Sequence, residues 1–347
     1  MIRARLAVLL SALSALSAFQ APEAGAQAEL RARDTLFTVD RPLEVTLRAD
    51  WREVFRHRDP EQEVKVPGSL LVVNGDRVDT IPVSYHTRGN FRLKPSTCSI
   101  PPVMIRFDQG NKSGTPFAGQ DELKLVTHCR DGDRYEQNNL VEYLTYRMYN
   151  LLTDRSFGAR RLVATWEDTV RTERSVKPAF VIEEDKMLAE RLGGSLDKSP
   201  VGFDESEPVT TALMSLYLLL IGNTDWSQPG QHNVKMVRTD STVQYLPVPY
   251  DFDWSGVINA PYARPDASLG LRTVRDRQYR GPCANPATFE AALGELLGKR
   301  EAMLGLVAGL DGLTDGRRKD VTDYLSGFFR DVTSHETLRR RYLGRCG

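Results

Sequence analysis

Four polar side chains that could take part in chemistry lie within the segment 221–256. They are Asp225, Asn233, Asp251 and Asp253. Carboxylate and amide oxygens suit a hard cation such as Mg²⁺, which usually takes one or two carboxylates together with phosphate oxygens. A single Asn or Asp is more often a turn residue than a ligand. Four of them within one short segment, with tryptophan and tyrosine neighbours, favour a binding or catalytic site.

A buried helix and a β-hairpin are predicted to position these residues. The apolar run TALMSLYLLLIG (211–222) predicts a helix that ends at Gly222, and Asp225 follows it. The runs HNVKMV and VQYLPVPY, joined by the polar turn 238–241, predict a hairpin with Asn233 at its start. If its second strand continues, the carboxylates of Asp251 and Asp253 lie on one face, because side chains alternate along a strand.

Two further candidates lie earlier in the chain. Lys124 is flanked by leucines in the predicted strand ELKL (122–125), where it is either on the solvent-facing half of the alternation or a ligand for an anion. Glu142 lies in the predicted helix NNLVEYLTYRMYNLL (138–152). With Asn139 as N-cap, Glu142 completes a capping box. The alternative is that Glu142 is an ion-pair partner of Lys124.

The remaining pattern predicts an α+β fold. Alternating runs predict β-strands at 43–49, 101–107, 160–168 and 177–185, and a hairpin at 68–87 turns at Asn74-Gly75. A short helix is predicted at 185–192, and the polar stretch 193–208 is predicted to be an exposed loop. Two amphipathic helices, 288–310 and 321–343, close the chain.

The N-terminus has the pattern of a secretory signal. Arg3 and Arg5 precede the apolar stretch LAVLLSALSALSAF, and small-x-small cleavage sites end at Ala26 and Ala28. We therefore expect residues 1–28 to be removed and the protein to be exported to the periplasm or the extracellular space. The other apolar runs are too short to span a bilayer, so we expect no membrane span.

Cysteine usage and charge agree with this location. The four cysteines form an even number in an oxidising compartment, which predicts two disulfides. Three pairings are possible, and we favour Cys98–Cys129 with Cys283–Cys346 because each bridge then stays within one half of the chain. Zinc is the weaker alternative, since there is no CxxC spacing. The 46 basic and 46 acidic residues give no support to a nucleic-acid partner.

The candidate residues follow one another in the order lysine, glutamate, aspartate, asparagine, aspartate. Protein kinases arrange their phosphate-binding, orienting, catalytic and metal-binding residues in this order. Over about residues 80–300 the chain resembles the CotH family of secreted, atypical protein kinases. The resemblance is carried by TRGNFR, ELKL, NNLVEYLTYRMYN, FVIEED and GNTDW…HN…PVPYDFDWSG.

The resemblance implies a two-lobed, kinase-like fold. A β-rich N-terminal lobe with one helix would span 29–184, and a mainly helical C-terminal lobe with the catalytic loop and metal site would span 185–347. It also implies ATP, with Mg²⁺ or Mn²⁺, and phosphoryl transfer to Ser or Thr of a protein substrate.

The resemblance also implies a role for each candidate residue. Lys124 would hold phosphates, Glu142 would orient Lys124, and Asp225 would act as the base. Asn233 and Asp251 would hold the metal. There is no GxGxxG loop, so the turn at Arg88, Gly89 and Asn90 is the candidate lid over the phosphates. Asp253 replaces the glycine of the kinase DFG motif and either takes a second metal or caps the turn.

Two other classes of function compete with an active kinase. A pseudokinase or envelope binding module would keep the fold without phosphoryl transfer, and ATP turnover separates these two hypotheses. A metal-dependent hydrolase would use Asp251 and Asp253 with His232. Metal-dependent hydrolysis without nucleotide would identify that third class.

Overall fold

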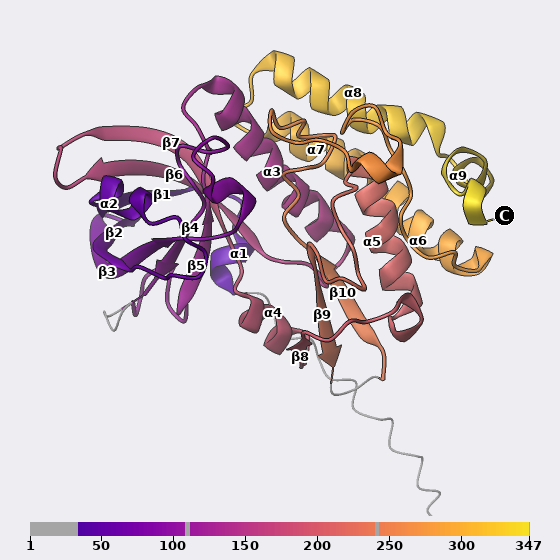
Figure 1. The fold of residues 1–347 in the computed structure, drawn as a ribbon, viewed down its shortest axis with the longest axis horizontal. Helices are drawn as coiled ribbons and strands as arrows, with labels where there is room; N and C mark the ends of the chain where they lie inside the picture. The colour runs from indigo at the N-terminus through magenta and orange to yellow at the C-terminus, as the bar shows by residue number, and fades with distance from the viewer. Residues whose placement is uncertain (1–33, 108–111, 240–242, 347) are drawn as a thin grey trace, which may run out of the picture.

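The computed structural model describes residues 34–107, 112–239 and 243–346 (Figure 1). The predicted signal segment and its cleavage sites lie outside the described residues, as does the tip of the predicted hairpin, 240–242.

Seven strands of the N-terminal half form a closed barrel in the order β1-β2-β3-β4-β5-β7-β6. Their bounds are β1 Leu43–Ala49, β2 Val66–Asn74, β3 Arg77–Thr87, β4 Val103–Arg106, β5 Glu122–Val126, β6 Ala159–Asp168 and β7 Arg174–Ile182. Adjacent strands pair antiparallel, except that β1 pairs parallel with β6 and so closes the barrel. The predicted turn between β2 and β3 is confirmed, with Gly75 in the left-handed region at φ 64°.

The barrel interior follows from strand alternation. Leu123 and Leu125 of β5 are fully buried in the barrel core together with Leu47 of β1. Lys124 therefore lies on the outer face of the barrel, because successive side chains point to opposite faces. The alternation thus positions Lys124 toward the rest of the molecule rather than inside the barrel.

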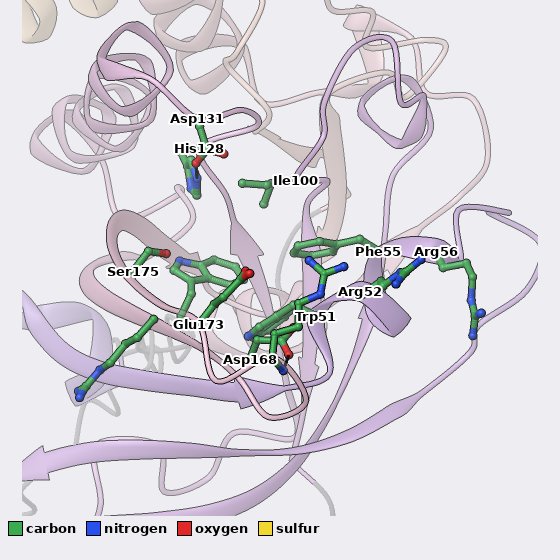
Figure 2. Close-up of a pocket in the computed structure, with 13 residues that line it drawn as sticks. Trp51, Arg52, Phe55, Arg56, Ile100, His128, Asp131, Asp168, Glu173 and Ser175 are labelled. Atoms are coloured by element: carbon green, nitrogen blue, oxygen red, sulfur yellow. Dashed lines mark hydrogen bonds and ion pairs between the residues drawn. The ribbon is translucent and has the colours of Figure 1, made fainter.

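Two short helices of the barrel region, α1 (Thr35–Thr38) and α2 (Trp51–Arg56), were not predicted. The α2 helix begins where the side chain of Asp50 accepts a hydrogen bond of 3.0 Å from the backbone N–H of Glu53. This Asp-x-x-Glu spacing was the available sequence signal. Trp51 and Phe55 of α2 line a pocket beside the barrel (Figure 2).

Helix α3 (Asp133–Leu152) begins at Asp133 rather than at Asn138, so the predicted capping box is wrong. Glu142 lies in the middle of the helix, and Asn139 donates its side-chain amide to the backbone oxygen of Val126 at 3.0 Å. The prediction began too late because residues 133–137 are polar and carry no apolar periodicity. Since Glu142 is not needed as a cap, its burial needs another explanation.

The second half of the chain is mainly helical. Its helices are α4 Asp185–Arg191, α5 Pro208–Ile221, α6 Pro286–Gly298, α7 Arg300–Gly309, α8 Asp315–Asp331 and α9 His335–Tyr342. The prediction for α5 is confirmed, with Gly222 in the left-handed region at φ 68°. The two predicted closing helices are each divided, because the backbone leaves helical geometry at Lys299 and at Val332.

A second sheet of three strands lies in this half, in the order β10-β9-β8. The strands are β8 Gly194–Asp197, β9 Val234–Thr239 and β10 Tyr245–Pro249. The antiparallel pair β9–β10 confirms the predicted hairpin. The prediction of an exposed loop over the whole of 193–208 is wrong, because four of its residues form β8 and pair with β9. The Gly, Ser and Pro content of this stretch is typical of a loop and gave no sign of the strand. Short 3-10 turns are η1 Phe91–Leu93, η2 Phe203–Glu205, η3 Ala267–Leu269 and η4 Gly344–Cys346.

The described residues form two hydrophobic cores, one inside the barrel and one among the helices. Helix α3 lies between the barrel and the helices α5 to α8 (Figure 1), and its buried residues belong to the helical core. The α+β class is confirmed. A kinase-like division into two lobes and a boundary near residue 184 stay predictions.

Both predicted disulfides are present, Cys98–Cys129 and Cys283–Cys346. The pairing is consistent with export to an oxidising compartment. Among the described helices, none combines the length and apolarity needed to cross a bilayer.

Candidate functional site

Asp225 lies in the loop after α5, and two neighbours hold its side chain. The ring Nε2 of His232 lies 3.0 Å from Asp225 Oδ1. The amide nitrogen of Asn233 donates to Asp225 Oδ2 at 3.1 Å and to the backbone oxygen of Asp225 at 2.7 Å. The backbone N–H of Asp225 donates to Asn223 Oδ1 at 2.8 Å. The carboxylate is therefore fixed by contacts on both oxygens, while its side chain stays 33% exposed.

The chain returns to Asp225 through a small antiparallel bridge. The backbones of Ser227 and His232 exchange two hydrogen bonds of 2.9 Å, which brings His232 and Asn233 beside the loop. Asn233 adopts φ 55°, a left-handed conformation that asparagine tolerates better than most residues. The spacing of eight residues between Asp225 and Asn233 is thus taken up by a turn.

The expected alignment of Asp251 and Asp253 along one strand is wrong. Strand β10 ends at Pro249, and Asp251 adopts φ 57°, which turns the chain. The N–H of Asp251 donates to the hydroxyl of Tyr146 at 2.9 Å. Asp251 is partly exposed, whereas Asp253 is 4% exposed. The two carboxylates therefore lie in different environments.

A pocket of about 400 Å³ opens at Asp225. Its lining combines aromatic rings with cationic groups: Trp226, Trp254, His232, Arg264 and Arg280. Arg280 donates to the backbone oxygen of Thr224, and Arg264 donates to that of Ala263 at 2.7 Å. These bonds hold both guanidinium groups at the wall of the pocket. The pocket is therefore a concave site whose lining combines two arginines with two carboxylates, those of Asp225 and Asp266.

Lys124 pairs with Asp185 instead of the expected Glu142. The ammonium group of Lys124 donates to Asp185 Oδ1, and Lys235 Nζ lies 3.1 Å from Asp185 Oδ2. Both ammonium groups lie over the ring of Tyr250, at 5.6 and 5.0 Å from its centroid. The Lys124 side chain is 18% exposed, so it is not a solvent-facing residue of the alternation. Burial lowers the pKa of Lys124, and the charge of Asp185 opposes that shift.

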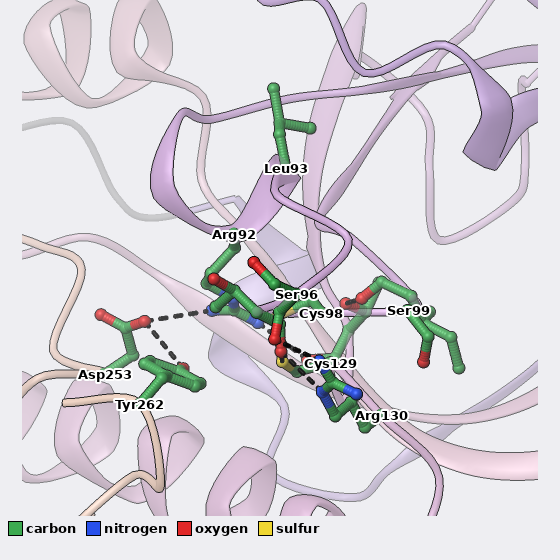
Figure 3. Close-up of a disulfide and its surroundings, with 12 residues drawn as sticks. Arg92, Leu93, Ser96, Cys98, Ser99, Cys129, Arg130, Asp253 and Tyr262 are labelled. Carbon is green, nitrogen blue, oxygen red and sulfur yellow. Dashed lines mark hydrogen bonds and ion pairs between the residues drawn. A yellow bond between two sulfur atoms is a disulfide. The ribbon is translucent and has the colours of Figure 1, made fainter.

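Glu142 belongs to a buried cluster with Arg92, Asp253 and Tyr262 (Figure 3 shows Arg92, Asp253 and Tyr262). Arg92 Nη1 lies 3.6 Å from Glu142 Oε2 and 3.7 Å from Asp253 Oδ2. The Tyr262 hydroxyl donates to Asp253 Oδ2 at 2.9 Å. Burial raises the pKa of Glu142 to about 7, against the opposing charge of Arg92. Burial also raises the pKa of Asp253, and the charge of Asp251 adds to that shift.

The disulfide Cys98–Cys129 holds the loop that carries Arg92 (Figure 3). Arg130, next to Cys129, donates to the backbone oxygens of Thr97 at 2.7 Å and Pro95 at 3.2 Å. Arg92 donates to the backbone oxygen of Thr127 at 3.0 Å. The covalent bridge and these bonds fix the position of the Arg92 guanidinium between α3 and the segment after β10.

Arg88 and Asn90, the predicted lid residues, differ in their surroundings. The Nε atom of Arg88 is buried without a hydrogen-bond partner among the described residues. Burial lowers the pKa of Arg88, and the charge of Asp251 opposes this, so Asp251 is a charged neighbour of Arg88. Asn90 is exposed and makes no side-chain cap bond to η1. Arg88 therefore fits an anion site near Asp251, and Asn90 has no such arrangement.

Sequence reasoning found Asp225 with Asn233 but missed several contacts. The sequence pattern does not single out Asp185, Lys235 or Arg92. For Asp185 the available signal was its place at the start of a predicted helix next to Glu183 and Glu184. For Arg92 there was no local signal, because its partners come from distant segments.

The residues present fit a magnesium–phosphate complex better than a metal held by protein alone. Within the described ranges, no three His, Cys, Asp or Glu side chains are grouped to hold a metal. Mg²⁺ needs only one or two carboxylates when phosphate oxygens and water supply the rest. Asn233 uses its amide nitrogen on Asp225, which leaves its oxygen for a ligand. Asp251 is partly exposed, and the backbone N–H of Tyr250, the residue before it, donates to the backbone oxygen of Asn233 at 3.0 Å.

No protein-family profile matches the chain, and no curated protein matches it either. A solved structure of a Helicobacter pylori proinflammatory kinase, CtkA, is similar to the chain with a TM-score of 0.40 and 9% sequence identity. The similarity covers 70% of this chain and 94% of the CtkA chain. A likeness of this size carries no argument about chemistry, so the side chains must carry it.

Proposed function

We propose that this chain is an exported phosphotransferase, which transfers the γ-phosphate of ATP to a Ser or Thr hydroxyl of a protein substrate. The observation that carries the proposal is the pair of hydrogen bonds that the Asn233 amide nitrogen donates to Asp225. These bonds hold Asp225, the candidate base, next to Asn233, the candidate metal ligand. They use only the amide nitrogen, which cannot bind a cation, and leave the amide oxygen for the metal. Phosphoryl transfer needs such positioned groups more than it needs covalent chemistry from the protein.

Asp225 accepts the proton of the attacking hydroxyl in this proposal. Its carboxylate is held by His232 and Asn233 and faces a pocket of about 400 Å³, large enough for an acceptor side chain. A general base must lie within hydrogen-bond reach of the proton that it takes, and this opening provides the approach. His232 is a positioning residue that holds Oδ1.

The Asn233 oxygen and the Asp251 carboxylate would hold Mg²⁺, or Mn²⁺, together with phosphate oxygens of ATP. The bound ion would neutralise charge on the transferring phosphate. Arg88 supplies a fixed positive charge next to Asp251. Asp253 is buried and bonded to Tyr262, so we assign it to holding Arg92 rather than to the metal.

Lys124 would bind phosphate oxygens, and Asp185 takes the orienting role expected of Glu142. Lys124 lies on the outer face of β5, and Asp185 is the first residue of α4. Lys235, on the other side of Asp185, adds a second cation at the same place. Glu142 instead holds Arg92, which links α3 to the segment after β10.

The test compares two aspartates that fail differently. Asp225→Asn should keep Mg-ATP binding but lose phosphate transfer by about 10² to 10⁴, the usual loss for a missing base. Asp251→Ala should lose metal-dependent ATP binding. Asp204→Asn, at an exposed position on η2, is the matched control. Calorimetric titration measures binding, and transfer from γ-labelled ATP to a generic Ser/Thr protein or to the chain itself measures activity.

A binding module without transfer is the second candidate, favoured by one observation. Lys124 and Glu142 lie in separate ion pairs, so the lysine–glutamate pair of active kinases is absent from the described contacts. Wild-type protein that binds Mg-ATP and transfers no phosphate would establish this candidate. The metal-dependent hydrolase has no comparable support, because His232 contacts Asp225 rather than Asp251 or Asp253 in the described structure.

A further inference from the structure

A larger pocket, of about 650 Å³, lies beside the barrel and shares no lining residue with the pocket at Asp225 (Figure 2). Its walls come from α2, from β6, from the start of β7 and the turn before it, from Ile100 and from residues 128–131. Figure 2 shows Trp51 and Phe55 on one side and His128 with Asp131 on another. A volume in this range is typical of small-molecule sites.

Three aromatic rings form the floor of this pocket. The centroids of Trp51 and Trp166 are 4.5 Å apart, and Phe55 lies 5.5 Å from Trp51 and 6.3 Å from Trp166. Trp51 comes from α2 and Trp166 from β6, so the barrel fixes the separation of the two indoles. Such a floor offers apolar and π contact to a flat ligand.

Two buried polar groups at the pocket have no hydrogen-bond partner among the described residues. The indole Nε1 of Trp166 is one, in a residue that is 7% exposed. The ring nitrogens of His128, which is 2% exposed, are the other, and Asp131 Oδ1 at 3.7 Å is too far for a hydrogen bond. By contrast, Trp51 Nε1 donates to the backbone oxygen of Leu47 at 3.3 Å. These nitrogens have almost no exposed surface, so the ligand contacts of this pocket come from its aromatic rings and its charged rim.

The charged groups of the lining leave an excess of positive charge. Asp168 is used within its own turn, where it accepts from the backbone N–H groups of Val170 and Arg171 at 2.9 and 2.8 Å. Asp131 lies 3.9 Å from Lys177, and Arg56 pairs with Glu53. The lining groups without an ion pair in the described structure are Arg52, Arg171, Arg174, Glu173 and Asp168, whose carboxylate keeps its charge. Three guanidinium groups against two carboxylates leave a net positive charge, which favours an anion.

We propose that this pocket is a second ligand site, which binds a small organic anion with a flat ring. The ring packs against Trp51, Phe55 and Trp166, and the anionic group faces the arginines of the rim. This site is independent of phosphoryl transfer, because none of its residues belongs to the Asp225 site.

The four tryptophans of the chain allow a test that reports the place of binding. In protein labelled with 5-fluorotryptophan, ¹⁹F NMR gives one signal for each of Trp51, Trp166, Trp226 and Trp254, and single Trp→Phe variants assign them. The probe is 2-naphthoate, and its neutral match is 2-naphthamide. We expect 2-naphthoate to shift the Trp51 and Trp166 signals and leave those of Trp226 and Trp254, which line the pocket at Asp225, in place.

Charge selection is tested with surface variants that should not disturb the fold. The double variant Arg171→Gln, Arg174→Gln should weaken 2-naphthoate about fivefold to tenfold, as expected for losing exposed charge pairs, and leave 2-naphthamide unchanged. Arg272→Gln, at a side chain 90% exposed and outside the pocket, should change neither. Trp166→Phe replaces the indole by a smaller ring and so removes part of the aromatic floor, which should weaken both probes.

Three results would overturn the proposal. One is unchanged Trp51 and Trp166 signals at millimolar 2-naphthoate. Another is equal affinity for 2-naphthoate and 2-naphthamide, which would leave only an apolar patch. The third is tighter binding of 2-naphthylmethylammonium than of 2-naphthoate, which would mean that Glu173 and Asp131 dominate the field.

Discussion

The ammonium group of Lys124 donates to the carboxylate of Asp185, which begins helix α4, rather than to Glu142 in α3. Alternation along β5 directs Lys124 outward from the barrel, and Asp185 at the start of α4 meets it there. The ion pair thus joins the barrel to the short helix and the β9 strand, where Lys235 shares the same carboxylate.

The first prediction follows from this pair. In the proposed site, Mg-ATP at a hundred times its dissociation constant stabilises wild-type protein by about 2.7 kcal/mol. Lys124→Met and Asp185→Asn should each reduce that stabilisation, whereas Lys319→Met, at an exposed position on α8, should preserve it. Thermal unfolding with and without Mg-ATP measures the effect. If Asp185→Asn leaves the nucleotide shift intact, Asp185 does not orient the lysine.

The second prediction concerns pH and Glu142. Its pKa is raised from an ordinary value of 4.5 to about 7, so the folded state keeps a proton that the unfolded state loses. Between these values the free energy of unfolding therefore falls as pH rises, because the unfolded state binds fewer protons. Glu142→Gln should remove this contribution. Urea unfolding from pH 4 to 8 should show the variant gaining on wild type as pH rises, and a constant difference would contradict the shift.

The third prediction concerns Gly222, where α5 ends in front of the Asp225 loop. A Cβ atom there would lie 2.0 Å from the hydroxyl oxygen of Tyr324, and φ is 68°. Gly222→Ala should cost about 1–2 kcal/mol for the left-handed backbone alone, and more for the clash. Adding Tyr324→Phe should relieve the clash with the hydroxyl, whereas the cost of the left-handed backbone should remain.

Gly294→Ala is the matched control for that substitution. Gly294 lies within α6, and a Cβ there would meet nothing within 4 Å. This variant should therefore gain up to about 1 kcal/mol of stability from helix propensity. Equal effects of the two alanines in urea unfolding would show that the geometry at Gly222 is not constrained.

The fourth prediction concerns the two disulfides. The oxidised protein should show no free thiol in denaturant, since the four cysteines are paired. Replacing either pair by serine should cost about 2–4 kcal/mol. Only the loss of Cys98–Cys129 should also alter the pH dependence assigned to Glu142, because that bridge holds the loop of Arg92. If both double variants show the same pH profile, the Cys98–Cys129 bridge does not affect the pKa of Glu142.

Local patterns predicted most strands and helices correctly. The Asn74-Gly75 turn, the alternation around Leu123 and Leu125, and the apolar run ended by Gly222 each depend on neighbouring residues. The start of α3 was missed because a polar first turn has no apolar periodicity. Strand β8 was missed because its four residues depend on pairing with β9.

The candidate site divides in the same way. Asp225 and Asn233 lie close in the chain, and the sequence suggested that they belong together. Lys124 could pair with either Glu142 or Asp185, and the order of residues along the chain favours Glu142. In the structure Glu142 pairs with Arg92 instead, and Lys124 pairs with Asp185. Which of several carboxylates meets a cation depends on tertiary structure.

The parallel pairing of β1 with β6 joins the two paired strands of the barrel that lie farthest apart in the chain. Leu43 pairs with Leu162 and Ala49 with Asp168, so one side of β1 has no partner until the chain has been made as far as Asp168. Pairing between such distant segments is slow, because the loop must close before the contacts form. Until β6 is available, the edge of β1 that pairs with it has unpaired backbone N–H and C=O groups. Such an edge is a template for association with other chains. A chaperone that binds this strand edge should therefore raise the yield of folded protein more than a chaperone that binds the helices.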